Sequence, residues 1–212
     1  MNRSDVMTTA RHSRWPICAA LLLLCGIGCA HTDPDPATLT ISCIGDGKSF
    51  TQCFNQAWST GGDSGDVDVV LVNGPDDPVR QIMHIRVLWK PTRDTKADHD
   101  SARNATVHWY VMGKSTPDII EYDGTAMVVV ESDEHGATLS IRSAVMRPVA
   151  RRGSLRDPIG QTSLHGTVRA TANPDRVRSV LKDLRASVTA ARSLPGNLTL
   201  RTHPESPSSS AQ

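Results

Sequence analysis

Aromatic residues and long apolar segments are scarce in this chain of 212 residues. Phe, Trp and Tyr together make up 4% of the sequence, and hydrophobic residues of all kinds make up 38%. A core must therefore rest on Val, Ile, Leu and Met, and the length suits one ordinary domain once a terminal segment and a polar tail are set aside. No apolar run reaches the roughly 20 residues that a membrane-spanning helix needs. A permanent transmembrane helix is thus the less favoured interpretation of the N-terminus.

An excess of charge of one sign is also missing. The formal net charge is +1, and the chain after residue 28 carries 20 basic and 21 acidic residues. Domains that bind nucleic acid usually carry a clustered positive excess. We therefore expect no nucleic-acid partner.

Motifs for catalysis, nucleotides and metals are missing as well. The chain has no P-loop and no GxSxG elbow. Residues 62–65 read Gly-Asp-Ser-Gly, the core of the nucleophile motif of trypsin-like serine proteases, but too little chain precedes them to supply the histidine and aspartate of a triad. The acidic loop around residues 94–100 lacks calcium-loop spacing and is interleaved with basic residues. We expect ordinary loops at both places, and neither a metal nor a cofactor.

The first thirty residues have the order of an export signal. Residues 1–14 are polar and basic, residues 17–24 are mostly apolar, and residues 26–30 are mostly small. The segment Gly-Ile-Gly-Cys that ends at Cys29 resembles the lipobox of bacterial lipoproteins, in which the cysteine is lipidated and becomes the new N-terminus. The resemblance is confined to this segment. It implies a signal peptide over residues 1–28, a lipid on Cys29 and attachment to a membrane.

The residues after Cys29 bear on the location. Residues 29–37 are polar and proline-stiffened, which suits a tether. In the lipoproteins that this segment resembles, Asp directly after the lipidated cysteine usually signals retention at the inner membrane. Ala30 stands there, so the resemblance implies the outer membrane, facing the periplasm. A secreted or periplasmic soluble protein is the alternative.

Five cysteines reduce to one pair when the processed segment is considered. Cys18 and Cys25 fall in the signal and Cys29 takes the lipid, which leaves Cys43 and Cys53. In an oxidising compartment this pair predicts a disulfide, and closing a loop of about ten residues is worth roughly 2 to 3 kcal/mol. Zinc would need two further ligands at suitable spacing.

The chain beyond the tether predicts a single domain over residues 38–195 and a disordered tail over 196–212. A helix is expected over 49–59, where Phe50, Cys53, Phe54 and Ala57 have helical spacing. A second helix is expected after Asn173-Pro174-Asp175, which combines a cap, a first-position proline and an acidic first turn. Its predicted apolar stripe comprises Val177, Val180, Leu181, Leu184, Val188 and Ala191.

Period-two alternation and turn residues predict the strands, and Asp123-Gly124 is interpreted as a tight turn. The expected strands cover residues 38–43, 66–72, 82–89, 106–112, 118–122, 125–132, 137–146 and 162–171. The fold class is therefore α+β, a mainly antiparallel sheet with a short N-terminal helix and a C-terminal amphipathic helix packed on one face. A β-sandwich or barrel is the main alternative.

Polar side chains on three predicted strands form the best candidate for a ligand-binding site. They are His84, Arg86, His108, Tyr110, His165 and Arg169. If their strands are neighbours, these groups make one basic, aromatic patch that suits an anion, through arginine pairing and imidazole donors, or a metal, through the histidines. Such residues also occur on any solvated sheet face. The arginines 147, 151, 152 and 156 fall in a predicted loop that could meet an anionic surface.

Two functional hypotheses follow. The first is a non-enzymatic envelope lipoprotein that binds another envelope protein or an anionic envelope component through its exposed sheet face. The second is a hydrolase or metal-dependent enzyme that uses the histidines. An enzyme requires His84, His108 and His165 to converge in a concave pocket.

Overall fold

The computed structural model describes residues 37–60, 66–73, 80–90, 103–113, 118–157 and 159–193. The predicted signal peptide, Cys29, the tether before residue 37 and the tail after residue 195 lie outside these residues. So do the glycine-rich segment 62–65 and the acidic loop 94–100. Within the described part of the chain, no helix has the length and apolarity to cross a membrane.

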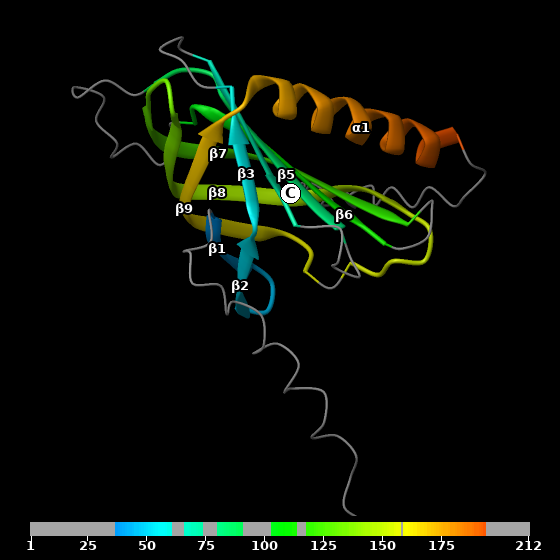
Figure 1. The fold of residues 1–212 in the computed structure, drawn as a ribbon. Helices are drawn as coiled ribbons and strands as arrows, with labels where there is room; N and C mark the ends of the chain where they lie inside the picture. The colour runs from blue at the N-terminus through cyan, green and yellow to red at the C-terminus, as the bar shows by residue number, and fades with distance from the viewer. Residues whose placement is uncertain are drawn as a thin grey trace, which may run out of the picture. The chain divides into compact units, whose positions relative to one another are not determined.

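Strands dominate the described residues, and a single long helix follows them (Figure 1). The elements are β1 (Ala37–Cys43), β2 (Ser49–Phe54), β3 (Gln56–Ser59), β4 (Val67–Val72), β5 (Arg80–Val87), β6 (Ala105–Met112), β7 (Ile119–Ser132), β8 (Gly136–Arg152), β9 (Thr162–Ala172) and α1 (Pro174–Ser193).

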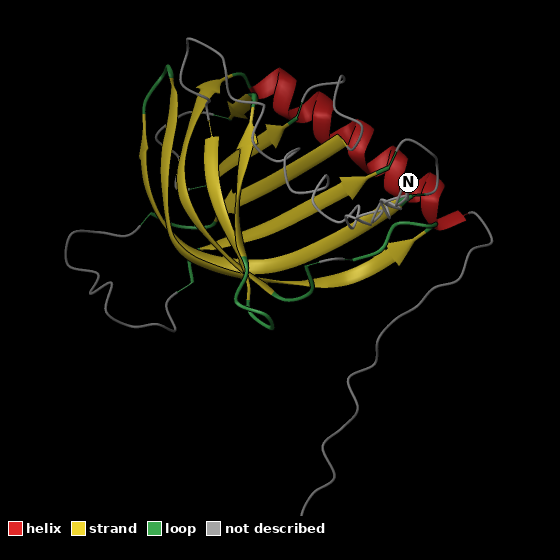
Figure 2. Ribbon diagram, turned by 90° about the horizontal axis from the view of Figure 1, so that it is seen from below, coloured by secondary structure: helices red, strands yellow, loops and turns green. Residues whose placement is uncertain are grey.

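The nine strands form one sheet that curls into a ring (Figure 2). Their order is β2-β1-β9-β3-β4-β5-β6-β7-β8, and β9 also pairs with β8, which closes the ring. Every pairing is antiparallel except that of β3 with β9. The expected antiparallel sheet and C-terminal helix are thus confirmed, and the curvature brings the sheet closer to the barrel alternative than to a flat α+β sheet.

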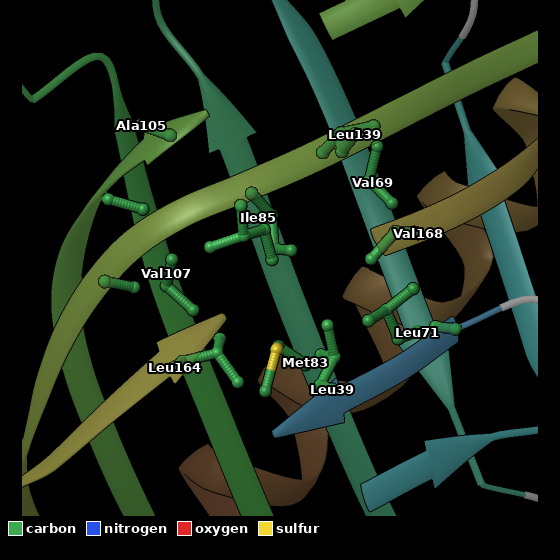
Figure 3. Packing of buried hydrophobic residues seen from close by; sticks show 14 of the residues in the cluster. Leu39, Val69, Leu71, Met83, Ile85, Ala105, Val107, Leu139, Leu164 and Val168 are labelled. Atoms are coloured by element: carbon green, nitrogen blue, oxygen red, sulfur yellow. The ribbon is translucent and has the colours of Figure 1, made fainter. Parts of the chain in front are cut away.

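The inside of the ring is filled by apolar side chains. Alternate residues of the strands point inward, so that Leu39, Ile85, Val107 and Leu139 are fully buried in one cluster (Figure 3). Trp109 stacks on Tyr122 in the same cluster, with ring centroids 4.9 Å apart. The aliphatic residues that the composition favours therefore do build the core, around two large aromatic rings.

Helix α1 packs on the outside of the ring. Asn173 caps it by accepting a hydrogen bond from Arg176 N at 2.9 Å, as the Asn-Pro-Asp start predicts. The predicted apolar stripe is confirmed: five of its six members are buried and Leu181 packs partly against them. They cover outward-facing residues of β3 to β7, among them Val70, Ile82 and Ile119.

The expected helix over residues 49–59 is wrong, because this segment forms β2 and β3 with a bend at Asn55. Phe54 points inward, and after the bend the inward positions are Ala57 and Ser59. The bend thus changes the spacing of buried residues from two to three. That step from Phe54 to Ala57 accounts for one half of the helical spacing, whereas Phe50 and Cys53 lie before the bend and are not buried.

The predicted disulfide between Cys43 and Cys53 is not formed. Both cysteines lie in the β1–β2 hairpin, but Cys53 is opposite Thr38, five residues along β1 from Cys43. At about 3.4 Å per residue the two Cα atoms are roughly 17 Å apart, whereas a disulfide joins Cα atoms less than about 7 Å apart. Burial raises the pKa of the Cys43 thiol.

The predicted turn at Asp123-Gly124 is also wrong, because β7 runs through it for 14 residues. Gly124 is required here by close packing and not by a turn. A Cβ at this position would lie 2.1 Å from Val145 O on β8. The Asp-Gly pair thus marks a close approach of two strands.

Candidate functional site

Two histidines and two aspartates form a row across the outer face of four neighbouring strands. His84 donates from Nε2 to Asp68 Oδ1 at 2.7 Å, and His108 donates from Nδ1 to Asp123 Oδ1 at 2.7 Å. The imidazoles are direct cross-strand partners and stack with ring centroids 6.1 Å apart. The hydrogen bond from His84 is the main reason that the pKa of Asp68 lies below its ordinary value. The carboxylates thereby fix the orientation of both rings.

An ion pair between a buried carboxylate and an exposed guanidinium lies beside this row. The Glu121 side chain is 6% exposed, and its Oε2 accepts a hydrogen bond from Arg192 of α1 at 2.9 Å. Its Oε1 has no partner among the described residues. Tyr110 is the cross-strand neighbour of Glu121, and burial, followed by the charges of Glu121 and Asp123, raises the pKa of its hydroxyl. A charged and partly desolvated cluster therefore lies where the end of α1 meets β6 and β7.

A groove runs between the C-terminal half of α1 and strands β5 and β6. It holds a pocket of about 220 Å³. The helix contributes Leu181, Leu184, Arg185, Val188, Thr189 and Arg192, and the strands contribute His84 and Tyr110. The pocket combines an apolar lining with two guanidinium groups, an imidazole and two hydroxyls. Such a set of donors suits a ligand that has an acidic group beside a short apolar part.

Four of the six predicted site residues share this outer face. His84, Arg86, His108 and Tyr110 occupy alternate positions of the paired strands β5 and β6. Arg86 is exposed and lies 3.6 Å from Asp66 Oδ2. The strand pairing that the patch requires is therefore present for these four residues.

The other two predicted residues lie elsewhere. His165 and Arg169 are on β9, opposite Thr40 of β1 and Thr138 of β8 respectively. In the sheet order, β3 and β4 lie between β9 and β5. His84 and His108 are therefore neighbours, whereas His165 lies apart from both. The arginines 147, 151 and 152 of the predicted loop belong to β8, which extends further than expected.

Several members of the site were not predicted from the sequence. Arg185 and Arg192 are spaced seven residues apart on a predicted helix, so their shared face was a usable signal. Asp68 was not included in the predicted patch. Glu121 was placed in a short strand over residues 118–122, and Asp123 in the turn expected after it. Their position depends on the continuity of β7, which local patterns did not indicate.

The comparisons with known proteins identify no relative: no protein-family model, no curated protein and no solved structure matches this chain. The function must therefore be inferred from the site itself. Among the described residues, no group of three or more His, Cys, Asp or Glu side chains is placed to hold a metal ion. The chemistry that the geometry offers most directly is the binding of an anion.

Proposed function

We propose that this chain is an exported, lipid-anchored protein of the bacterial cell envelope, whose domain binds an anionic envelope component in the groove beside α1. The domain acts as a binding module and not as a catalyst. The lipid on Cys29 holds it at the outer membrane, facing the periplasm. Support for the anchor comes from the export-signal order of residues 1–28 and from the resemblance of the segment before Cys29 to a lipobox.

The composition of the groove is the observation that carries the binding proposal. Arg185 and Arg192 present guanidinium groups beside Tyr110 and Thr189, over an apolar base. Arginine recognises carboxylate and phosphate groups through paired hydrogen bonds. An oriented His84 adds a further nitrogen at the same pocket. Because apolar side chains fill the inside of the ring, a ligand is expected on the outer face.

The anchor is tested by intact mass spectrometry of the membrane fraction of producing cells, beside a Cys29→Ser variant. A chain that begins at Cys29 with the mass of a diacylglyceryl group is the expected result. The variant should lose the lipid and leave the membrane. An unlipidated wild-type chain would overturn the anchor and make a secreted role the better hypothesis.

The binding site is tested by titrating the protein with hexyl phosphate and following backbone amide resonances. Shifts should concentrate on α1, β5 and β6. Arg185→Gln should weaken binding, whereas Arg142→Gln, an exposed change on β8, should not. Shifts that are spread over the whole ring, or equal effects of the two variants, would contradict the proposal.

His165 lies apart from the other two histidines, which counts against an enzyme that uses all three. The histidine–aspartate pairs favour a narrower second candidate, a hydrolase that uses His84 alone as its base. An imidazole held by a carboxylate is the base of many hydrolytic enzymes, and hydroxyls of Tyr110 and Thr189 line the same pocket. This candidate predicts turnover of chromogenic phosphate or carboxylic esters that His84→Ala abolishes. Binding without turnover supports the binding module instead.

A further inference from the structure

Four of the five exposed basic residues of α1 lie along one flank of the helix, and the fifth, Arg176, lies over the ring of Trp58 on another side. Arg178, Lys182, Arg185 and Arg192 follow one another at spacings of four, three and seven residues, and such spacings place side chains in one line on a helix. Thr189 lies on the same line, four residues after Arg185 and three before Arg192. We call these four residues the basic line. Because Arg185, Thr189 and Arg192 line the pocket, this flank is the one that borders the groove.

The basic line is longer than a single small anion. Arg192 follows Arg178 by 14 positions on the helix, which is about 21 Å at 1.5 Å per residue. One phosphate or carboxylate can contact two neighbouring members at most. A linear chain with repeated acidic groups can contact all four.

The charges of the basic line remain available to a ligand. Within the described part of the chain, no ion pair joins Lys182 or Arg185 to an acid. The outer two members do pair, Arg178 with Asp175 and Arg192 with Glu121, yet their side chains are 76% and 56% exposed. The acid Asp183 does not belong to this flank, since it is one residue from Lys182 and two from Arg185.

From this arrangement we infer that the ligand of the groove is a linear polyanion, which lies along the basic line between α1 and the β5–β6 surface. The inference rests on the proposed function and specifies its ligand class. The repeated acidic group is a phosphodiester, a carboxylate or a sulfate, because all three bind guanidinium and ammonium groups in the same way. The concave shape favours a single extended chain over a flat lipid surface, because the sheet wall that carries His84 and Tyr110 stands beside the helix flank.

The test uses full-length protein in a neutral detergent and linear inorganic polyphosphate of defined lengths, with orthophosphate for comparison. Affinity should rise with chain length until the polymer spans the basic line, and it should fall as salt is added, because counterions are released on binding. The double variant Lys182→Glu/Arg185→Glu should weaken binding of the long polymer about tenfold or more. The matched variant Arg142→Glu/Arg169→Glu changes the same amount of charge on β8 and β9 and should have little effect. Circular dichroism checks that both variants are folded.

The outcomes separate the two proposals. Orthophosphate that binds at the groove as tightly as the long polymer overturns the polyanion inference and leaves the proposed function standing. Equal loss in the two double variants overturns the inference, because attraction is then unspecific. Binding to vesicles that contain anionic phospholipid, undisturbed by free polyphosphate, also overturns it and points to a membrane surface. Failure of every anion to bind overturns the inference and the proposed function together.

Discussion

The ion pair between Glu121 and Arg192 predicts a specific pattern of stabilities. Arg192→Ala leaves a carboxylate that is 6% exposed without a charged partner, and its Oε1 already lacks one among the described residues. A hydrogen bond to a charged group contributes about 1.5–3 kcal/mol. Because the Arg192 side chain is 56% exposed, solvent screening places the expected loss near the lower part of that range, at about 2 kcal/mol.

Replacing the carboxylate should reverse most of this loss. Glu121→Gln in the Arg192→Ala background removes the buried charge, so the double variant should be more stable than Arg192→Ala alone. Urea unfolding of the wild type, Arg192→Ala, Glu121→Gln and the double variant gives the coupling free energy. The unfolding is followed by tryptophan fluorescence from the buried Trp109. For a domain of this size the loss corresponds to a drop in Tm of about 4–8 °C.

Two results would refute this reasoning. If Arg192→Ala unfolds at the same urea concentration as the wild type, the carboxylate does not depend on its partner. If the double variant is no more stable than Arg192→Ala, the loss comes from helix packing and not from the unpaired charge. Arg178→Ala serves as the control, because its pair with Asp175 is exposed and should contribute little.

Three further predictions concern polar groups in and around the ring. Asn104→Ala should lower the free energy of unfolding by about 2–3 kcal/mol, because this buried amide makes three hydrogen bonds to backbone groups, and urea denaturation measures the loss. Tyr122→Phe should cost about 1–2 kcal/mol, since its hydroxyl donates to Asp157 at 2.6 Å, and unchanged thermal stability would count against that bond. Asp68, whose pKa is lowered mainly by the hydrogen bond from His84, contributes stability that is present above its unfolded pKa near 3.9 and is lost as pH falls through the lower folded value. In Asp68→Asn the free energy of unfolding should therefore decrease less between pH 5 and pH 2, and an acid dependence equal to that of the wild type would contradict this.

The elements that could be predicted from the sequence are those whose pattern is complete within the element. The paired strands β5 and β6 alternate strictly, and α1 has a cap, a stripe and a basic end. In both cases the local pattern and the tertiary environment require the same structure. Half of the candidate site followed, since His84 and His108 lie on that strand pair.

The remaining parts depend on contacts that no local pattern shows. Gly124 has the composition of a turn, but the approach of β8 explains it. At the bend at Asn55 the spacing of inward-facing residues changes from two to three, and a spacing of three also occurs in helices. The groove itself forms only where α1 crosses the sheet, so Arg185 and Glu121 belong to one site through topology and not through sequence spacing.

The position of β9 has a consequence for the order of folding. It pairs with β8 along one edge and with β1 and β3 along the other, and Ala37 at the start of the described chain faces Val168. Contacts so distant in sequence form slowly, because the intervening loop must close before they stabilise anything. Until residues 162–172 arrive, β3 and β8 keep open edges that can pair with other chains. A nascent or partly unfolded chain is therefore most prone to aggregate just before its last strand is in place, and a chain cut before Thr162 would remain in that state.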